Sequence, residues 1–535
     1  IPAIIRGMQS NPASRQIARA AGMVAAAMII SQLIGLVRGI LIYRTFGTTA
    51  DLDSFNAANR VTEVLFNLMA GGALGSAFIP TFTGLLAKDN RQRAWKLAAA
   101  IANLLILVLS GVTLLAAIFA PQIVRHGLFI LAPDLSTGQE LLTIRLMRIM
   151  LPSVVIFGLS GLAMGILNAH QIFWMPALAP AMYSIGMILG VAIFPASWGI
   201  DRLAWGALLG SGLHLLVQMP GLIRLRGRYS VTLGRDIQEV GEVMRLMGPR
   251  ILGVAVVQIN FIVNTIIALS LPEGSVSAVT LAFALMLMPQ AAIAQSLAIA
   301  AMPTFSAQVA LGKLDEMRAA FAATLRGALL LAIPAAVGVI LLRYPIIRVL
   351  YERGEFTAHS TDLVTWALLW YSIGLVGHSL VEISSRAFYA LHNTKTPVLV
   401  GVAAMSLNLV FSLTLPAGFA QLGWMPHGGL ALANTLATAL EAAALLVLLR
   451  RQMKGLNGRA IGQVTVQAGL AATAMALGLA LWLMATRNIP NWIQAVGGVA
   501  VGSGLYGLLL WGLRVHEVSR VMAAVRRRLP GRFQS

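Results

Sequence analysis

The sequence predicts an all-α polytopic membrane protein with fourteen transmembrane helices, and three observations support that prediction. The chain of 535 residues is 58% hydrophobic and only 11% charged, whereas soluble domains carry about 25% charged residues. Apolar runs of about 18 or more residues recur between polar breaks, as bilayer-spanning helices require. Lys and Arg residues gather in alternate loops, which is typical of multi-pass membrane proteins.

The expected helices follow one another along the whole chain. A basic segment with Arg6, Arg15 and Arg19 precedes the first apolar run, and we expect that run to be a retained helix rather than a cleaved signal peptide. The fourteen ranges are 21–46, 54–87, 97–120, 141–166, 172–196, 203–223, 250–271, 276–302, 320–342, 363–390, 396–417, 427–449, 463–486 and 491–513.

The distribution of basic residues orients these helices. One set of alternate loops, together with both tails, holds 26 of the 39 Lys and Arg residues, the opposite set holds 7, and 6 lie within spans. Because cytoplasmic loops accumulate Lys and Arg, we expect both termini in the cytoplasm. Attraction to anionic membrane lipids accounts for the net charge of +20. The basic loops lack aromatic interleaving, so we expect no nucleic-acid partner.

Two short motifs indicate an internal repeat. The stretch from Ala77 to Thr83 resembles the one from Ala300 to Ser306, with a Pro at 80 and at 303, and a second Pro pair falls at 176 and 397. The two pairs have nearly the same spacing, which covers six expected spans. Both copies therefore have one orientation, as in carriers built from parallel repeats around a central cavity.

This repeat gives the expected division of the chain. The parts are an N-lobe with helices 1–6 at 1–225, a cytoplasmic amphipathic linker at 226–249, a C-lobe with helices 7–12 at 250–455, helices 13–14 at 456–513, and a basic cytoplasmic tail at 514–535.

Charged residues within spans are the main candidates for a binding site, since each is costly in a bilayer unless it faces a cavity or a partner. Arg38 lies in the first helix, with no carboxylate within helical reach, and Asp53, Arg60, Glu63 and Asn67 lie on the second. One interpretation is a cationic cavity wall that holds phosphate oxygens. The other is an intrahelical Arg60–Glu63 pair that neutralises itself.

Two further pairs sit at i, i+4 spacing. Asn260 and Asn264 share a face of the seventh helix, where they either contact a ligand or join helices through hydrogen bonds. Glu382 and Arg386 lie near the cytoplasmic end of the tenth helix. We expect this pair to neutralise itself and treat it as a candidate gate or contact between lobes.

Asn408, Asn434 and Thr438 are weak candidates for a sodium site, because they offer oxygen ligands on the eleventh and twelfth helices. Packing is the alternative role for the three. The sequence has no cysteine, no phosphate-binding Gly-rich loop followed by Lys-Ser or Lys-Thr, and no His-Glu-x-x-His. We therefore expect no enzyme activity, no confident metal site and no cofactor beyond coupling to sodium or to the membrane potential.

Three segments resemble the MurJ/MviN family: 31–80, from SQLIGLVRG to SAFIP; 246–277, from LMGPRILG to EGSVS; and 351–397, from YERGEF to HNTKTP. The resemblance implies an inner-membrane carrier, working without ATP, for undecaprenyl-diphosphate-linked muropeptide, lipid II. The carrier would move lipid II from the cytoplasmic to the periplasmic leaflet for peptidoglycan synthesis by alternating access of two lobes. It also implies a groove for the lipid tail in helices 13–14.

Residue by residue, the resemblance implies that Arg38 is the family's first-helix arginine, Asp53 the acidic residue at the start of the second helix, and Arg60 a commonly basic position. The chain lacks the family's charge at five positions, which are Gln32, Gly39, Phe66, Phe283 and Ala284. The alternatives are therefore a flippase for another lipid-linked oligosaccharide and a membrane scaffold that has lost transport. An antiporter for cationic drugs is disfavoured because cavity carboxylates are nearly absent. We expect a monomer.

Overall fold

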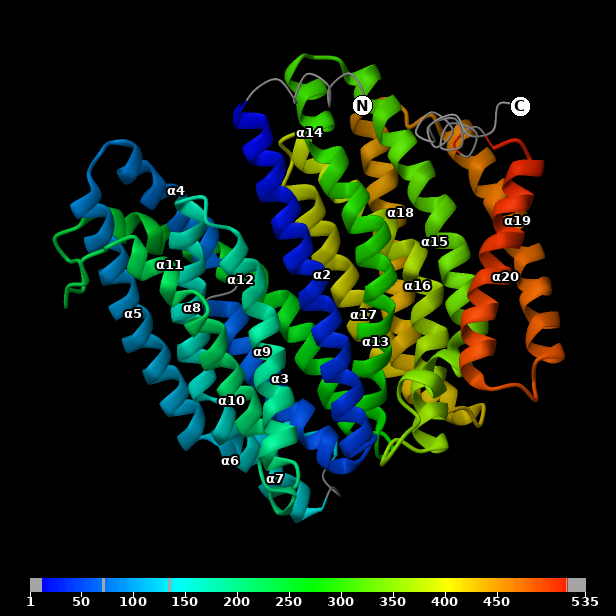
Figure 1. Ribbon diagram of the computed structural model, residues 1–535, viewed down its shortest axis with the longest axis horizontal. Coiled ribbons are helices and arrows are strands. Elements are labelled where there is room, and N and C mark those ends of the chain that lie inside the picture. The colour runs from blue at the N-terminus through cyan, green and yellow to red at the C-terminus, as the bar shows by residue number, and fades with distance from the viewer. Residues whose placement is uncertain (1–11, 70–72, 133–135, 516, 518–535) are drawn as a thin grey trace. The chain divides into compact units, whose positions relative to one another are not determined.

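The structure, a computed structural model, describes residues 12–69, 73–132, 136–515 and 517 of the chain. Within these ranges the regular elements are all helices (Figure 1), and none of the described residues forms a strand. Among the described residues, twelve helices are long and apolar enough to cross a membrane. The all-α polytopic class is therefore confirmed. Arg6 and the tail beyond 517 lie outside the described residues.

The chain divides into two compact units, Ile1–Val276 and Ser277–Ser535. The helices that belong to unit 1 are α2 (Pro12–Phe46), α3 (Ala50–Met69), α4 (Ala73–Ala87), α5 (Arg91–Ile118), α6 (Ala120–Gln122), α7 (Thr137–Met150), α8 (Pro152–Ala169), α9 (Trp174–Ile193), α10 (Asp201–Leu216), α11 (Met219–Arg224) and α12 (Gln238–Leu269), with a π-helical turn at Ile123–Leu128 and a 3₁₀ turn at Ala196–Trp198.

Unit 2 takes the rest of the described chain and contains the longest helix. Its elements are α13 (Ser275–Gln290), which begins at the boundary between the units, a π-helical turn at Ala291–Gln295, α14 (Ser296–Ala310), α15 (Leu314–Leu350), α16 (Ala358–Ala390), α17 (Lys395–Gln421), α18 (His427–Gln452), α19 (Gly458–Ala485) and α20 (Asn491–Gly512).

The fourteen expected spans correspond to twelve such helices and two shorter apolar ones, Ala77–Ala87 and Val254–Leu269. The expected second span, 54–87, is divided between α3 and α4, and residues 70–72 between them lie outside the described part. The first half of this expected span is polar because α3 carries several charged side chains. The count of fourteen membrane crossings therefore stays a prediction.

The boundary between the two compact units differs from the expected boundary between lobes. The expected linker, 226–249, includes the start of α12, which is one continuous helix from Gln238 to Leu269. That helix packs against α3, α4 and α5 and so belongs to unit 1. The expected lobes, 1–225 and 250–455, divide the chain according to the internal repeat. That division stays a prediction.

Each unit, taken by itself, carries the same local structures at the spacing of the predicted repeat. Helices α4 and α14 are both 15 residues long, with Pro80 and Pro303 at corresponding positions. After each of them the chain turns through a left-handed residue, Asp89 with φ 55° and Gly312 with φ 69°. The repeated aromatics at positions 82 and 305 are both fully buried. These correspondences support the duplication inferred from the two motifs.

Glycines bring α9 and α10 into backbone contact. Gly186 and Gly190 on α9 face Gly206 and Gly210 on α10, and a Cβ built on Gly186 would lie 2.1 Å from the Gly210 Cα. Small residues four apart are the usual means of close approach between membrane helices. This approach holds α9 and α10 together in unit 1.

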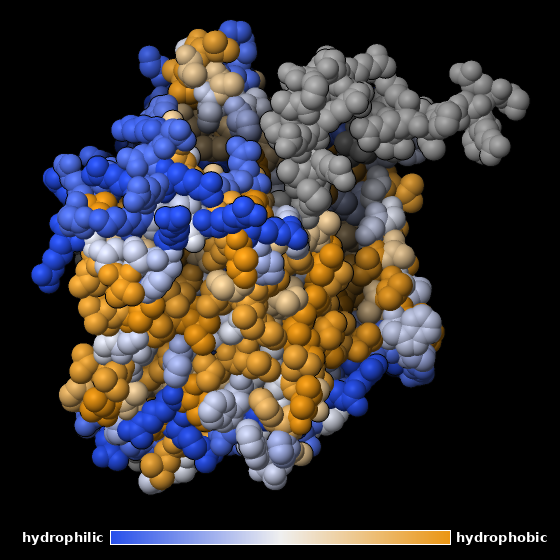
Figure 2. Space-filling view, turned by 60° about the vertical axis from the view of Figure 1, so that its left-hand side comes forward, coloured by the Kyte–Doolittle hydropathy of each residue, from blue (hydrophilic) through white to orange (hydrophobic). Residues whose placement is uncertain are grey.

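The surface is consistent with a bilayer environment. Figure 2 shows an apolar belt between two hydrophilic bands on the face that it presents. Many large apolar side chains are exposed, among them Leu107, Leu114 and Ile118 on α5. Such a surface is favourable in lipid, whereas a soluble monomer rarely exposes a contiguous apolar area of this kind.

Candidate functional site

A polar cavity of about 370 Å³ lies inside unit 1. Its walls come from α2, α3 and the helices α7 to α10, and they combine one arginine, one glutamate and several uncharged polar groups with aromatic rings. The lining residues are Arg38, Asn59, Thr62, Glu63, Phe66, Asn67, Met150, Ser153, Phe157, Pro180, Tyr183, Ala207 and His214. Three residues predicted from the sequence, Arg38, Glu63 and Asn67, are thus brought together here.

Arg38 is the cation of this cavity. Its Nη1 lies 3.4 Å from the Ser184 hydroxyl and 3.9 Å from the Met187 sulfur, both on α9. Among the described residues, no ion pair includes Arg38 and no hydrogen bond uses its Nε or Nη2. A guanidinium offers five N–H donors in a planar fork. The arrangement therefore leaves a positive charge with unused donors at the edge of a polar cavity.

Arg60 and Glu63 form an ion pair within α3. Arg60 Nη1 lies 2.7 Å from Glu63 Oε2, and the guanidinium also stacks over the Phe261 ring of α12 at 5.2 Å. Of the two interpretations of this pair, the self-neutralising one describes the geometry. Glu63 still lines the cavity, whereas Arg60 is directed towards α12 and is not among the lining residues.

A buried hydrogen-bond network supports the cavity wall behind the cation. The Ser160 hydroxyl of α8 lies 2.6 Å from His214 Nδ1 of α10, and Gln218 Nε2 donates to that hydroxyl at 2.5 Å and to the His214 carbonyl at 2.9 Å. His214 is thus a packed polar group, as its isolation in the sequence suggests. Ser160 and Gln218 are not among the sequence candidates; the i, i+4 spacing of His214 and Gln218 is a signal for Gln218, whereas Ser160 lies 54 residues from His214 and has no such signal.

Phe66 and Phe283, two positions at which the resemblance implies charged residues, lie in clusters of aromatic rings. Phe66 packs against Phe157 in the cavity wall at a centroid distance of 5.1 Å. In unit 2, Phe283 lies 5.3 Å from the Tyr371 ring and 6.4 Å from the His378 ring. Both phenylalanines thus pack against neighbouring rings within their own unit.

Asp53 acts as a helix-end acceptor rather than as part of the cavity. Its Oδ2 accepts a 2.8 Å hydrogen bond from the Gly274 N–H, and Glu273 Oε1 accepts one of 2.8 Å from the Ala50 N–H. Each carboxylate thus accepts a hydrogen bond from the backbone of the other residue's turn, one at the start of α3 and one at the start of α13. Negative charge is favourable at helix N-termini because it satisfies free N–H groups. We call these two hydrogen bonds the carboxylate latch.

The remaining polar pairs each have hydrogen bonds within one helix. Asn264 Nδ2 donates to the Asn260 carbonyl and to its Oδ1, both at 3.0 Å, along α12. Arg386 binds Glu382 Oε1 through Nη2 at 3.0 Å and through Nε at 3.2 Å along α16. The expected self-neutralisation of the Glu382–Arg386 pair is therefore confirmed. Its assignment to a gate stays a prediction.

The sodium candidates lie in unit 2, on α17 and α18. The Asn434 Oδ1 and the Thr438 hydroxyl both approach His378 Nε2, at 3.1 and 3.5 Å. Asn408 lies on the neighbouring helix, where its Oδ1 accepts from Ser412 at 3.5 Å. Within the described residues, no group of three or more His, Cys, Asp or Glu side chains could hold a metal. Two of the three oxygen ligands are thus engaged with an imidazole.

In the described part of the chain, twelve membrane-length helices and a polar cavity lined by an arginine without an ion-pair partner are the features of a multi-pass membrane carrier. A comparison with family models then gives the family, because residues 42–496 match the model described as "Lipid II flippase MurJ". The chain belongs to the MurJ family. This family consists of transporters rather than enzymes. It is the family that the three sequence segments resemble.

Related proteins agree with this assignment. The lipid II flippase MurJ of Burkholderia cenocepacia is 31% identical over 435 residues, covering 79% of this chain and 82% of that protein. The probable lipid II flippase MurJ of Bdellovibrio bacteriovorus is 30% identical over 517 residues, covering 95% and 97%. A solved lipid II flippase MurJ in an inward closed conformation has a TM-score of 0.77 at 23% identity, covering 92% of this chain and 99% of that one. An inward-facing MATE transporter of the MOP superfamily has a TM-score of 0.66 at 17% identity, covering 82% and 99%.

Proposed function

We propose that the protein moves lipid II, the undecaprenyl-diphosphate-linked muropeptide, from the cytoplasmic to the periplasmic leaflet of a bacterial inner membrane. Arg38 is the observation that carries the proposal. A guanidinium that lines a polar cavity without a carboxylate partner in the described part of the chain is suited to an anion that comes and goes. The family relationship supplies the identity of that anion as a lipid-linked diphosphate.

Each part of the cavity has a role in this proposal. Arg38 holds the diphosphate through a bidentate fork, which a point charge could not match in geometry. Asn67 and Asn59 offer amide donors on the opposing helix α3. Glu63, whose charge Arg60 offsets at 2.7 Å, repels the anion less than a free carboxylate would. The hydrogen-bond network around His214 holds α8 and α10 in register behind this wall.

The carboxylate latch is the proposed outer closure. It ties the α2–α3 turn to the α12–α13 turn. These turns are corresponding positions in the repeat, because the ends of α2 at Phe46 and of α12 at Leu269 have the same spacing as Pro80 and Pro303. The two hydrogen bonds between backbone and carboxylate, each 2.8 Å long, are individually modest. A latch of this strength opens readily when substrate binding favours another conformation.

The orientation of the chain follows from its basic loops. Both termini lie in the cytoplasm in this proposal, because 26 of the 39 Lys and Arg residues fall in the tails and the alternate loops on that side. A monomer is part of the proposal, since this one chain contains the cavity and both copies of the predicted repeat.

A flippase for a different lipid-linked oligosaccharide is the second candidate. Phe66 and Phe283 favour it, because both replace charges of the resembled family with packed rings.

Sodium or the membrane potential is the proposed driving force, with Asn408, Asn434 and Thr438 as the sodium candidates. A sodium site there requires the His378 imidazole to release the oxygens of the latter two.

Complementation tests the function. Bacteria depleted of their own lipid II flippase are supplied with the wild-type chain, with Arg38→Ala, or with Arg44→Ala. Arg44 is the matched control because it is an exposed arginine on the same helix, outside the cavity. We expect growth with wild type and Arg44→Ala and loss of growth with Arg38→Ala, at equal amounts of inserted protein. Failure of the wild-type chain to restore growth would favour the second candidate, and full growth with Arg38→Ala would remove the assigned role of Arg38.

A further inference from the structure

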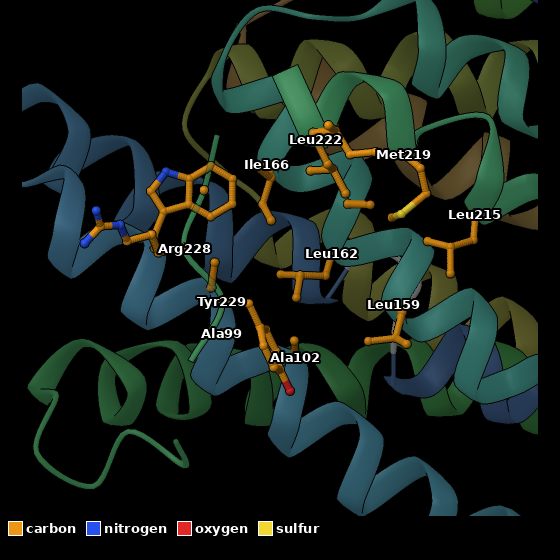
Figure 3. A pocket seen from close by; sticks show the side chains of 15 residues that line it. Ala99, Ala102, Leu159, Leu162, Ile166, Leu215, Met219, Leu222, Arg228 and Tyr229 are labelled. Atoms are coloured by element: carbon orange, nitrogen blue, oxygen red, sulfur yellow. The ribbon is translucent and has the colours of Figure 1, made fainter. Parts of the chain in front are cut away.

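A second pocket of unit 1, of about 360 Å³, is separate from the polar cavity. It lies where α5 and α8 meet α11 and the segment that follows α11. Alanines of α5 form one wall, leucines and an isoleucine of α8 form another, and α11 closes the end (Figure 3). The side chains labelled there include Ala99, Ala102, Leu162, Ile166 and Leu222. This volume is within the range of about 300–1,000 Å³ that is usual for ligand pockets.

The lining of this pocket is mainly aliphatic, with the rings of Trp95 and Tyr229 beside the aliphatic side chains. Leu162, Ala163 and Ile166 of α8 are at most 5% exposed, and the small side chains of Ala98 and Ala99 leave open space on the α5 side. Among the described residues, no carboxylate or amide side chain lines it. A polar ligand would lose hydrogen bonds with water on entering such a space. The interior is therefore suited to a hydrocarbon chain.

The rim of the pocket is cationic. Arg228 lines the pocket, and Figure 3 shows it at one edge of the group of aliphatic side chains. Arg224 and Arg226 precede it in the same segment, and all three arginines are exposed. In the part of the chain that the structure describes, none of the three has an ion-pair partner. A hydrocarbon-lined interior with the unpaired Arg228 at its edge, and two more exposed arginines in the same segment, is complementary to an anionic amphiphile.

The segment that carries these arginines is held in place against α5. Asn103 Nδ2 donates to the carbonyls of Ser230 at 3.1 Å and Thr232 at 2.9 Å, and the Tyr229 hydroxyl donates to Asn103 Oδ1. At Gly227 the segment lies so close to the α5 tryptophan that a Cβ would meet the indole at 2.2 Å. The rim is therefore built into the fold, so its arginines have defined positions relative to the pocket.

We propose that this pocket binds one anionic phospholipid of the membrane, with an acyl chain between α5 and α8 and the phosphate at Arg228. This inference does not depend on the flippase function, so each of the two proposals is tested by its own experiment. A soluble anion is not the proposed ligand, because the binding free energy would come mainly from burial of the chain. A segment of this protein is not the proposed occupant either, because the rim charge selects an anionic headgroup.

The absence of cysteine from the whole chain allows a direct test. A single cysteine is introduced by Ala102→Cys on the α5 wall, and a control cysteine by Leu107→Cys, which is 61% exposed on the same helix and outside the pocket. The rate of maleimide labelling is measured on the full-length protein in detergent while phosphatidylglycerol or phosphatidylcholine is added. Arg228→Gln is then combined with Ala102→Cys, and Arg245→Gln, an exposed arginine of α12 outside the pocket, is the matched charge control.

We expect phosphatidylglycerol to protect the cysteine at 102 at about a fivefold lower concentration than phosphatidylcholine, as one arginine near a phosphate predicts. Arg228→Gln should abolish that difference, Arg245→Gln should preserve it, and the cysteine at 107 should not distinguish the lipids. Equal protection by both lipids, or a difference that survives Arg228→Gln, would overturn the proposal. So would protection by inorganic phosphate alone, or slow labelling at 102 without any lipid, which would mean that the chain itself covers the pocket.

Discussion

Asp53 Oδ2 accepts a 2.8 Å hydrogen bond from the backbone N–H of Gly274, which is 221 residues away in the sequence. In the opposite direction, Oε1 of the neighbouring Glu273 accepts a 2.8 Å hydrogen bond from the backbone N–H of Ala50. An acidic residue at the start of the second helix is therefore neither a surface charge nor a cavity ligand. It holds the turn of the first copy of the repeat against the corresponding turn of the second copy.

Asp53→Ala should lower stability, because Asp53 is only 7% exposed and the Gly274 N–H would lose its acceptor. An unsatisfied buried donor costs about 1–3 kcal/mol. Thermal unfolding of the purified protein in detergent measures the change. Asp51→Ala is the control, since Asp51 is exposed two residues earlier on α3, and we expect it to leave the unfolding temperature nearly unchanged. Equal effects of the two substitutions would argue against the latch.

Phe66→Arg should strengthen binding of a polyprenyl diphosphate. Position 66 lines the same cavity as Arg38, and a charge-assisted hydrogen bond to a phosphate oxygen is worth about 1.5–3 kcal/mol, or roughly tenfold or more in affinity. Loss of the ring pair with Phe157 should cost about 0.5–1.5 kcal/mol of stability. Native mass spectrometry with the lipid diphosphate measures the affinity. Phe66→Leu removes the ring without adding charge, and an arginine variant that bound no more tightly than the leucine variant would contradict the cavity assignment.

Gly186→Ala should destabilise unit 1, because the added methyl would meet the Gly210 Cα at 2.1 Å and the helices α9 and α10 would have to separate. Overpacking of this kind costs about 1–3 kcal/mol. The midpoint of thermal unfolding is the measurement. Gly212→Ala is the matched control, since a Cβ at Gly212 meets nothing within 4 Å. Its unfolding temperature should stay the same or rise. A neutral Gly186→Ala would show that the glycine contact is dispensable.

The segment before α12 should be held less firmly in acid. A hydrogen bond from Lys96 lowers the pKa of the exposed Asp236 carboxyl below its usual value. Because the folded pKa lies below that of the unfolded chain, about 3.9, the contact stabilises the segment at neutral pH and is lost as the pH falls through the lowered pKa.

Amide hydrogen exchange of residues 226–237 measures this effect. Asp236→Asn should speed the exchange at neutral pH and should have little effect in strong acid, below the lowered pKa. Asp89→Asn removes an equal charge from an exposed left-handed turn that asparagine tolerates, and we expect no change in the same amides. An effect of Asp236→Asn that persisted unchanged in acid would contradict the role of the carboxylate charge.

Much of the fold was predictable because bilayer helices need long apolar runs, and these runs are visible in the sequence without any tertiary information. The all-α class and the duplication marked by Pro80 and Pro303 were both accessible in this way. The division of the expected second span was not, because apolar length alone cannot show where α3 and α4 part. Nor was the association of α12 with the first unit, which depends on packing against α3, α4 and α5.

The candidate site was predictable to a smaller extent. Charged and amide side chains within spans identified Arg38, Glu63 and Asn67, which do line one cavity. The same signal also selected Arg60, which pairs with Glu63 of its own helix, and Asn260 and Asn264, which hydrogen-bond to each other along α12. Spacing of i, i+3 or i, i+4 is compatible with both a local pair and a shared wall, so sequence alone left the two open.

By itself, the sequence determined the class of protein and the identity of the charged residues, and it predicted the repeat, because composition and periodicity depend on local chemistry. Only the tertiary structure decided which of those charges are free and which are paired. It placed Arg38 beside Ser184 rather than a carboxylate, and Asp53 against the Gly274 amide. The reason is physical: in a low-dielectric interior the behaviour of a charge depends on its nearest partners, and these come from helices far apart in the sequence.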